Sequence, residues 1–186
     1  MEKIRMSRRQ VLRLGGLAVL AWAVPLPARA AFEKISAGAS AKELSLFNTH
    51  TGEELEAVFW EEGDYRPEEL HRIDHILRDP LTGETKAMDV RLVDLLYRLR
   101  QNLAAPNAYH VICGYRSPQT NAALRRRSAG VAAHSLHMTG QAVDIRLPGV
   151  PLASLHRAAL ALKAGGVGYY PQSGFVHVDV GPVRTW

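Results

Sequence analysis

His137, Asp144 and His177 are the residues whose types and spacing best suit metal chemistry in this sequence. Asp144 lies inside the apolar run 141–147 and His177 inside the run 174–180, and both runs alternate with the period of a β-strand. A polar side chain inside such a strand is unfavourable unless something pairs it. One zinc ion would satisfy two imidazoles and a carboxylate together and would leave a fourth position open for catalysis. The competing interpretation is three unrelated buried polar groups, each with a partner of its own.

The elements predicted around these residues give an α+β fold, a small and mainly antiparallel sheet flanked by helices. A hairpin over 42–60 is expected to turn at Thr51–Gly52. Helical periodicity covers 66–79, 89–103, 117–128 and 151–165. Further strands are predicted over 108–116, 141–147, 166–170 and 174–180. Ser117 followed by Pro118 is typical of a helix start.

The first thirty residues have the pattern of an export signal rather than of a folded domain. They combine a basic start, an apolar stretch from Leu14 to Leu26 and a small-residue cleavage site that ends at Ala30. Arg8–Arg9 adds a twin-arginine signature, which predicts export to the periplasm. Retention as a membrane anchor is the alternative, although the stretch is shorter than the roughly 20 residues that a spanning helix needs.

The rest of the chain is interpreted as a flexible lead-in, residues 31–43, and one domain, residues 44–186. Of the 23 Lys and Arg and the 18 Asp and Glu, six basic residues and one acidic residue lie in the first thirty positions, so the remainder is neutral overall. A neutral domain lacks the basic field that binds a phosphate backbone, which argues against a nucleic-acid partner. The single cysteine, Cys113, lies in an apolar run and is predicted to be a small core residue, with a reactive thiol as the alternative.

The run 135–145, SLHMTGQAVDI, resembles the S-x-H-x-x-G-x-A-x-D motif of zinc D-alanyl-D-alanine peptidases. Over residues 44–186 the chain is similar to the YcbK-like murein endopeptidases of the same LAS metallopeptidase superfamily. The other stretches that carry this resemblance are NTHTGE, LRDPLTGE, GYRSPQTNAALRRRS, GGVGYYPQSGFVHVDVG and VRTW. The resemblance implies a LAS-type fold, as in Hedgehog domains and D-Ala-D-Ala peptidases, and one zinc ion held by His137, Asp144 and His177.

The resemblance also implies roles for residues around the zinc. Arg116 matches an arginine that holds the substrate's carbonyl oxygen or carboxylate, a task that suits a guanidinium group. Its position at a strand-to-helix turn is usual for site residues, and a surface salt bridge is the alternative. We expect Tyr115 and Ser135 to contribute to substrate binding. Tyr169 and Tyr170 are interpreted as cleft wall or core.

The general base has no direct match in the sequence. Many members of the superfamily carry Glu or Asp three residues before the last ligand, where this chain has Gly174. Asp179, on the same predicted strand face as His177, is our candidate for the base or a proton shuttle. The alternative is that Asp179 orients a zinc ligand. His134 is a further candidate, as a donor to the transition state.

These features predict an exported, zinc-dependent murein endopeptidase that hydrolyses peptide cross-links of peptidoglycan in the periplasm during wall remodelling. In the family it resembles, such links include the 3-3 type between two meso-diaminopimelate residues. The near alternatives are links of D-alanine to diaminopimelate, or a D,D- or L,D-carboxypeptidase activity on wall peptides. A different class, a catalytically silent peptidoglycan-binding module, is suggested by Gly174. A wall hydrolase needs control, so a regulatory protein partner is expected, although no feature of the sequence identifies it.

Overall fold

A computed structural model describes residues 40–128 and 130–186. The predicted export signal, residues 1–30, and most of the predicted lead-in therefore lie outside the described residues. The first strand begins at Ala41, so residues 41–43, which were expected to belong to the lead-in, are part of a strand. Within the described part, no helix has the length and apolar character needed to cross a membrane.

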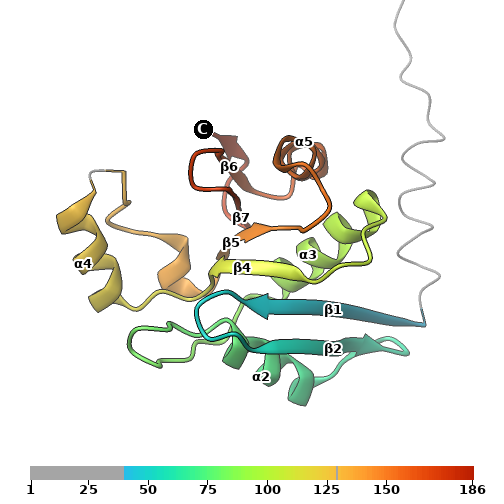
Figure 1. The fold of residues 1–186 in the computed structure, drawn as a ribbon. Helices are drawn as coiled ribbons and strands as arrows, with labels where there is room; N and C mark the ends of the chain where they lie inside the picture. The colour runs from blue at the N-terminus through green and yellow to red at the C-terminus, as the bar shows by residue number, and fades with distance from the viewer. Residues whose placement is uncertain (1–39, 129) are drawn as a thin grey trace, which may run out of the picture. The chain divides into compact units, whose positions relative to one another are not determined.

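All described strands join in one sheet, in the order β3-β2-β1-β4-β5-β7-β6-β8 (Figure 1). Neighbouring strands pair antiparallel except β1 with β4 and β6 with β8, which run parallel. The strands are β1 (Ala41–Asn48), β2 (Glu54–Glu61), β3 (Asp64–Tyr65), β4 (Tyr109–Cys113), β5 (Ala142–Arg146), β6 (Gly166–Tyr170), β7 (Phe175–Asp179) and β8 (Arg184–Thr185). The sheet is mostly antiparallel, and the predicted α+β class is confirmed.

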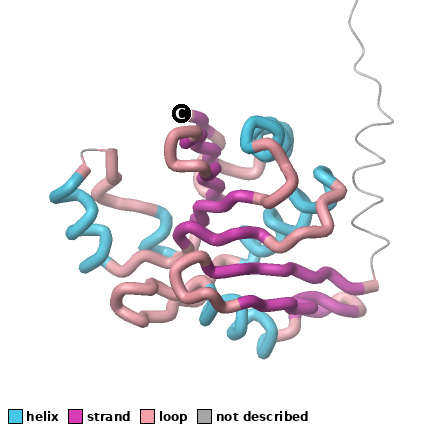
Figure 2. The backbone as a smooth tube through the Cα atoms, viewed as in Figure 1, coloured by secondary structure: helices cyan, strands magenta, loops and turns pink. Residues whose placement is uncertain are grey.

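Three helices cover one face of this sheet and enclose a single apolar core. They are α2 (Pro67–Ile76), α3 (Val90–Leu103) and α5 (Leu152–Leu162). Their buried residues pack with apolar strand residues such as Phe59. The segment 77–89 joins α2 to α3 as a loop (Figure 2). Helix α4 (Pro118–Arg127) and the short 3-10 helix η1 (Leu136–Thr139) lie together at one end of the strands, away from these three helices (Figure 1).

The alternation of the central strands turns their polar residues away from the helices. Along β5, Val143 and Ile145 belong to the core, so Asp144 faces the opposite side of the sheet. Along β7, the valines on either side of His177 belong to the core, so His177 points to the same side as Asp144. The sheet therefore separates an apolar face from a polar one, as the sequence pattern predicted.

The predicted start of α4 at Ser117 and Pro118 is confirmed. The two edge strands, β3 and β8, were not predicted. Ser117 Oγ accepts the backbone N–H of Thr120 at 3.1 Å, and Pro118 is the first helical residue. β3 and β8 are only two residues long, too short to show a period in the sequence. β8 nevertheless carries Arg184 to the polar face of the sheet, where it matters for the site described next.

Candidate metal centre and cleft

Four strands place one row of residues side by side on the polar face of the sheet. Cys113 on β4 pairs with Asp144 on β5, Asp144 with His177 on β7, and His177 with Gly168 on β6. Cross-strand partners have Cβ atoms about 4.5–5.5 Å apart. The pairing therefore gathers a thiol, a carboxylate and an imidazole from segments distant in the sequence. Gly168 leaves space for the indole of Trp186, which a Cβ at this position would approach to 2.7 Å.

Cys113 reaches this row because β4 contains a bulge. Val111 pairs with Ile145, and regular pairing would then place Ile112 opposite Asp144. The register shifts between Val111 and Cys113, so that Cys113 opposes Asp144 instead. The prediction that Cys113 is a core residue is therefore corrected, because the thiol is partly exposed and borders the polar centre.

His137 comes from η1, a turn that is fixed at both of its ends. At the start, Ser135 Oγ accepts the backbone N–H of His137 at 3.4 Å. At the end, Gly140 has a φ of 71°, and a Cβ there would lie 2.5 Å from the carbonyl oxygen of Ala87, so glycine is needed. The carbonyl of His137 accepts the backbone N–H of Arg116 at 3.2 Å, which ties η1 to the segment after β4.

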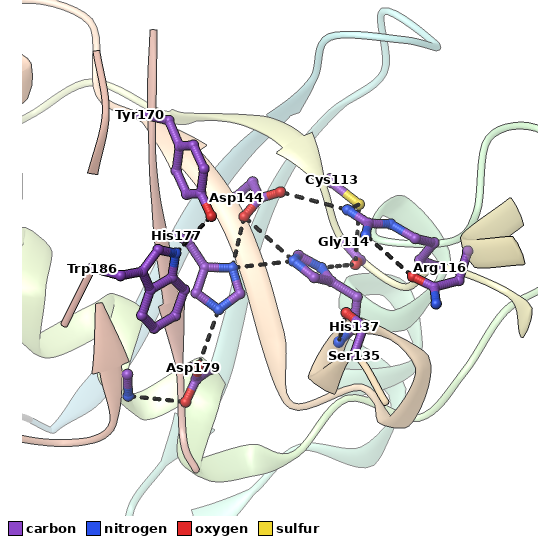
Figure 3. A network of polar contacts seen from close by, with 12 residues as sticks. Cys113, Gly114, Arg116, Ser135, His137, Asp144, Tyr170, His177, Asp179 and Trp186 are labelled. Atoms are coloured by element: carbon purple, nitrogen blue, oxygen red, sulfur yellow. Dashed lines mark hydrogen bonds and ion pairs between the residues drawn. The ribbon is translucent and has the colours of Figure 1, made fainter. Parts of the chain in front are cut away.

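One atom from each of the three predicted ligands points to a common position (Figure 3). His177 Nδ1 lies 2.8 Å from Asp144 Oδ1, and His137 Nε2 lies 3.3 Å from the same oxygen. The two nitrogens are 3.2 Å apart. Atoms bound tetrahedrally to zinc with bonds of about 2.0–2.1 Å are separated by about 3.3 Å. The three atoms therefore form approximately one face of such a tetrahedron, and all three side chains are buried.

The other ring nitrogens determine where the two imidazoles carry their protons. His137 Nδ1 lies 2.8 Å from the carbonyl oxygen of Gly114, which can only accept, so this nitrogen carries the hydrogen. His177 Nε2 lies 3.0 Å from Asp179 Oδ2 and donates in the same way. When it is neutral, each imidazole therefore turns its lone pair toward Asp144. Three lone pairs that face one point repel each other unless a cation lies between them, so the donor set fits a metal ion.

The charges at the centre lead to the same conclusion. Burial raises the pKa of Asp144, but the neighbouring His137 and His177 hold it well below its ordinary value. Burial lowers the pKa of His137, yet the carboxylate of Asp144 and the nearby Cys113 raise it well above its ordinary value. The buried carboxylate thus attracts positive charge, which a divalent cation supplies when the rings are neutral.

Asp179 is fully buried and is surrounded by donors. Its carboxylate accepts the backbone N–H groups of Gly166 and Gly181, each at 2.9 Å, and the two terminal nitrogens of Arg184 at 3.2 and 2.7 Å. Burial raises the pKa of Asp179, but His177 and these donors lower it well below its ordinary value. A Cβ on Gly166 would lie 2.5 Å from Oδ2, so the close approach needs glycine. These contacts favour the alternative in which Asp179 orients His177 over the role of base.

A second possible ligand set contains the cysteine. The ligand atoms of Cys113, His137 and Asp144 all lie within 4.8 Å of one another. The set that contains His177 is tighter, since its longest separation is 3.3 Å. In addition, Cys113 Sγ already accepts a hydrogen bond from Arg116 Nη2 at 3.3 Å. The geometry therefore favours His177 as the third ligand and leaves Cys113 beside the centre.

Arg116 lies at the turn between β4 and α4, next to the centre. Its Nη2 is 3.7 Å from Asp144 Oδ2, and its buried Nε has no hydrogen-bond partner among the described residues. The turn is held by the fully buried Asp79, whose Oδ2 accepts the backbone N–H of Ser117 at 2.8 Å. The guanidinium group is therefore fixed beside the ligands and retains a donor that is not used by the described part of the protein.

A cleft of about 560 Å³ opens onto this centre. The side chains that line it include Arg116, Ser128, His134, Ser135, His137, Asp144, Tyr170, Phe175, His177, Arg184 and Trp186. His134 is exposed at this surface, and Ser135 both lines the cleft and begins η1. Tyr115 is only 6 % exposed and belongs to the core, so the structure does not bring it to the cleft.

Two residues of the cleft, Arg184 and Trp186, were not among the predicted site residues. Arg184 binds Asp179, and the ring of Trp186 lies 5.2 Å from the ring of His177, measured between centroids. Their motif, VRTW, has no alternation or ligand spacing from which a role could be inferred. The only signal was its presence in the resemblance to the murein endopeptidases.

The fold and the site define an α+β domain with a candidate metal centre of three protein ligands that is open to a cleft. Three ligands and an open side are the form of a catalytic metal site rather than of a structural one. The family model Peptidase_M15_2, described as "Peptidoglycan L,D-endopeptidase MepK", matches residues 36–186. The chain therefore belongs to this peptidase family, which implies the LAS-type fold.

Curated relatives cover the whole chain. Peptidoglycan L,D-endopeptidase MepK of Escherichia coli (strain K12) is 44% identical over 186 residues, which is 100% of both chains. The protein of the same name from Shigella flexneri has the same identity and coverage. Probable peptidoglycan L,D-endopeptidase MepK of Haemophilus influenzae is 40% identical over 187 residues, covering 100% of this chain and 98% of the relative.

Proposed function

We propose that this protein is a zinc-dependent peptidoglycan L,D-endopeptidase that hydrolyses peptide cross-links between glycan strands. The observation that carries the proposal is the convergence of His137 Nε2, Asp144 Oδ1 and His177 Nδ1 beside an open cleft. Membership of a peptidase family, and relatives whose names describe peptidoglycan L,D-endopeptidases, support it.

The three converging residues hold one zinc ion in this proposal. Zinc bound there supplies Lewis acidity and activates water for the hydrolysis of a peptide bond. The protein keeps both imidazoles in the tautomer that the ion needs, through the carbonyl of Gly114 and the carboxylate of Asp179. The role of Asp179 is then to position His177, and Arg184 holds Asp179 in its ionised form.

Arg116 binds the carbonyl oxygen of the scissile bond or a carboxylate next to it. Its guanidinium group borders the ligands and lines the cleft, where its planar array of donors suits a carbonyl or carboxylate acceptor. His134 is exposed in the cleft lining, where it can carry a proton to or from the substrate. Gly174 contributes no side chain to this step.

The bond that we propose is the 3-3 link between two meso-diaminopimelate residues, which fits the L,D specificity in the names of the relatives. The same names speak against links of D-alanine to diaminopimelate and against a carboxypeptidase. Peptidoglycan lies outside the cytoplasmic membrane, so the enzyme works there. We propose that Arg8–Arg9 directs it to the periplasm through the twin-arginine pathway.

The experiment that tests the function is digestion of purified, cross-linked peptidoglycan by the zinc-loaded protein, with the products separated and weighed. New uncross-linked muropeptides, absent with His137→Ala and after treatment with a chelator, are expected, and their masses identify the bond. Intact cross-links in the presence of one bound zinc per chain would contradict the proposal. That result would favour the peptidoglycan-binding module, with Gly174 as the reason.

A further inference from the structure

An aromatic wall borders the candidate centre on the side away from Arg116. Trp186 packs its indole beside His177 and over Gly168. The backbone of Trp186 is fixed to β6, since its N–H donates to Val167 O at 3.3 Å and its carbonyl accepts Tyr169 N–H at 3.1 Å. The indole is therefore a fixed part of the cleft, although half of its surface is exposed.

Tyr170 is held next to this indole in one orientation. Its ring stacks on Phe175, with centroids 4.6 Å apart and an angle of 22° between the planes. Its hydroxyl oxygen lies 2.6 Å from Trp186 Nε1. Figure 3 shows the hydroxyl end of Tyr170 turned toward Asp144 and His177. Both tyrosine and tryptophan line the cleft.

The direction of this hydrogen bond has a chemical consequence. An indole N–H can only donate, so the Tyr170 oxygen is the acceptor. The hydrogen of the phenol must then point away from Trp186. Among the described residues, no side chain or backbone group accepts this hydrogen, so it remains available to a substrate in the cleft that Tyr170 lines. A hydroxyl whose orientation is fixed by one partner is a preorganised donor for a second one.

We propose that Tyr170 is a catalytic hydrogen-bond donor, and that Trp186 is the residue that positions it. In this role the Tyr170 hydroxyl donates to the oxygen of the scissile carbonyl group as negative charge develops there, from the wall opposite Arg116. The inference rests on the proposed endopeptidase function and deepens it, because it names a donor outside the S-x-H-x-x-G-x-A-x-D motif. A neutral donor in a partly enclosed cleft stabilises the transition state more than the ground state.

The first test compares Tyr170→Phe with the unaltered protein on a purified cross-linked muropeptide dimer. We expect kcat to fall about 10²-fold while KM changes less than about threefold, since loss of one such donor costs about 10²–10³ in kcat. Zinc content and thermal unfolding should not change. Tyr169→Phe is the matched control, because Tyr169 stacks on His156 with centroids 4.7 Å apart and is absent from the cleft lining. It should retain full activity.

A double-mutant cycle separates positioning from packing. Trp186→Phe keeps an aromatic ring but removes the N–H, and we expect about a 10-fold lower kcat in the unaltered background. In the Tyr170→Phe background the same change should have no further effect. Equal losses in both backgrounds would show that Trp186 acts by packing, and would overturn its positioning role.

A binding measurement gives a readout that does not depend on turnover. A phosphinate analogue of the cross-link carries a tetrahedral phosphorus in place of the scissile carbonyl. It should bind Tyr170→Phe more weakly than the unaltered protein, and the fold-loss in its affinity should be about equal to the fold-loss in kcat/KM. Unchanged kcat and unchanged analogue affinity in Tyr170→Phe would overturn the inference while the proposed function stands. Absence of turnover in the unaltered, zinc-loaded protein would instead overturn the function and, with it, this role of Tyr170.

Discussion

His177 donates its Nε2–H to Asp179 Oδ2 over 3.0 Å, and both residues lie on the polar face of β7. This hydrogen bond decides which nitrogen of the ring is left with a lone pair, and so turns Nδ1 of His177 toward His137 and Asp144. Asp179 in turn forms an ion pair with Arg184 of the edge strand β8. The candidate metal centre thus depends on a chain of contacts that begins at β8.

Replacement of Asp179 by asparagine tests this chain of contacts. The amide side chain would place an N–H₂ group among donors and would lose the charge that pairs with Arg184. We expect zinc affinity to fall about 10–100-fold, as measured by competition with a chromophoric chelator. Asp64→Asn, in the exposed strand β3, is the control and should bind zinc normally. Unchanged zinc affinity together with lost turnover would return Asp179 to the role of base or proton shuttle.

Cys113→Ala distinguishes the two possible ligand sets. Because His177 completes the tighter set, we expect the variant to bind zinc within about threefold of the unaltered protein and to keep its activity. The cobalt-loaded protein should show no thiolate-to-metal absorption band in the near ultraviolet. Such a band in the unaltered protein, lost in Cys113→Ala, would make Cys113 a ligand instead.

Arg116→Lys tests the proposed substrate role of the guanidinium group. A lysine keeps the charge but cannot form the planar fork of donors that the guanidinium group presents beside the cleft. We expect kcat/KM to fall about 10²-fold with zinc content unchanged. Arg125→Lys, near the end of α4, should have no effect. If Arg116→Lys lost zinc as well, the arginine would be acting on the ligands rather than on the substrate.

Asp79 offers a test of stability rather than of catalysis. Burial raises the pKa of Asp79, but hydrogen bonds from Thr120, Ser117 and Leu81 lower it below its ordinary value. A lowered pKa in the folded state stabilises the protein above the unfolded pKa of about 3.9 and loses this effect as the pH falls. Asp79→Asn should therefore reduce the free energy of unfolding by about 1–3 kcal/mol at pH 7.

Denaturant titrations at several pH values measure this effect. The difference between Asp79→Asn and the unaltered protein should stay constant down to about pH 5 and narrow as the pH is lowered further, through the unfolded pKa of about 3.9. A difference that stays constant with pH would mean that the charge of Asp79 is not what holds the turn before α4. Asp64→Asn again serves as the exposed control.

Local patterns in the sequence were sufficient for much of the fold and for the candidate ligands. Alternation along 141–147 and 174–180 placed Asp144 and His177 on one face, because side chains of a strand point to opposite sides in turn. Ser117 and Pro118 predicted the start of α4, because capping depends only on neighbouring residues. The motif around His137 carried the remaining candidate ligand.

Other features were decided only by the tertiary structure, because they depend on pairing between distant segments. The bulge that moves Cys113 to the polar face is a property of the β4–β5 register and leaves no local period. Tyr115 turned to the core although its neighbour Arg116 faces the centre. Asp179 was a candidate base from its position in the sequence, but β8 places Arg184 in an ion pair with its carboxylate. The sequence by itself determined which groups could hold a metal. Long-range strand pairing decided which of them converge on one point and which are held by other partners.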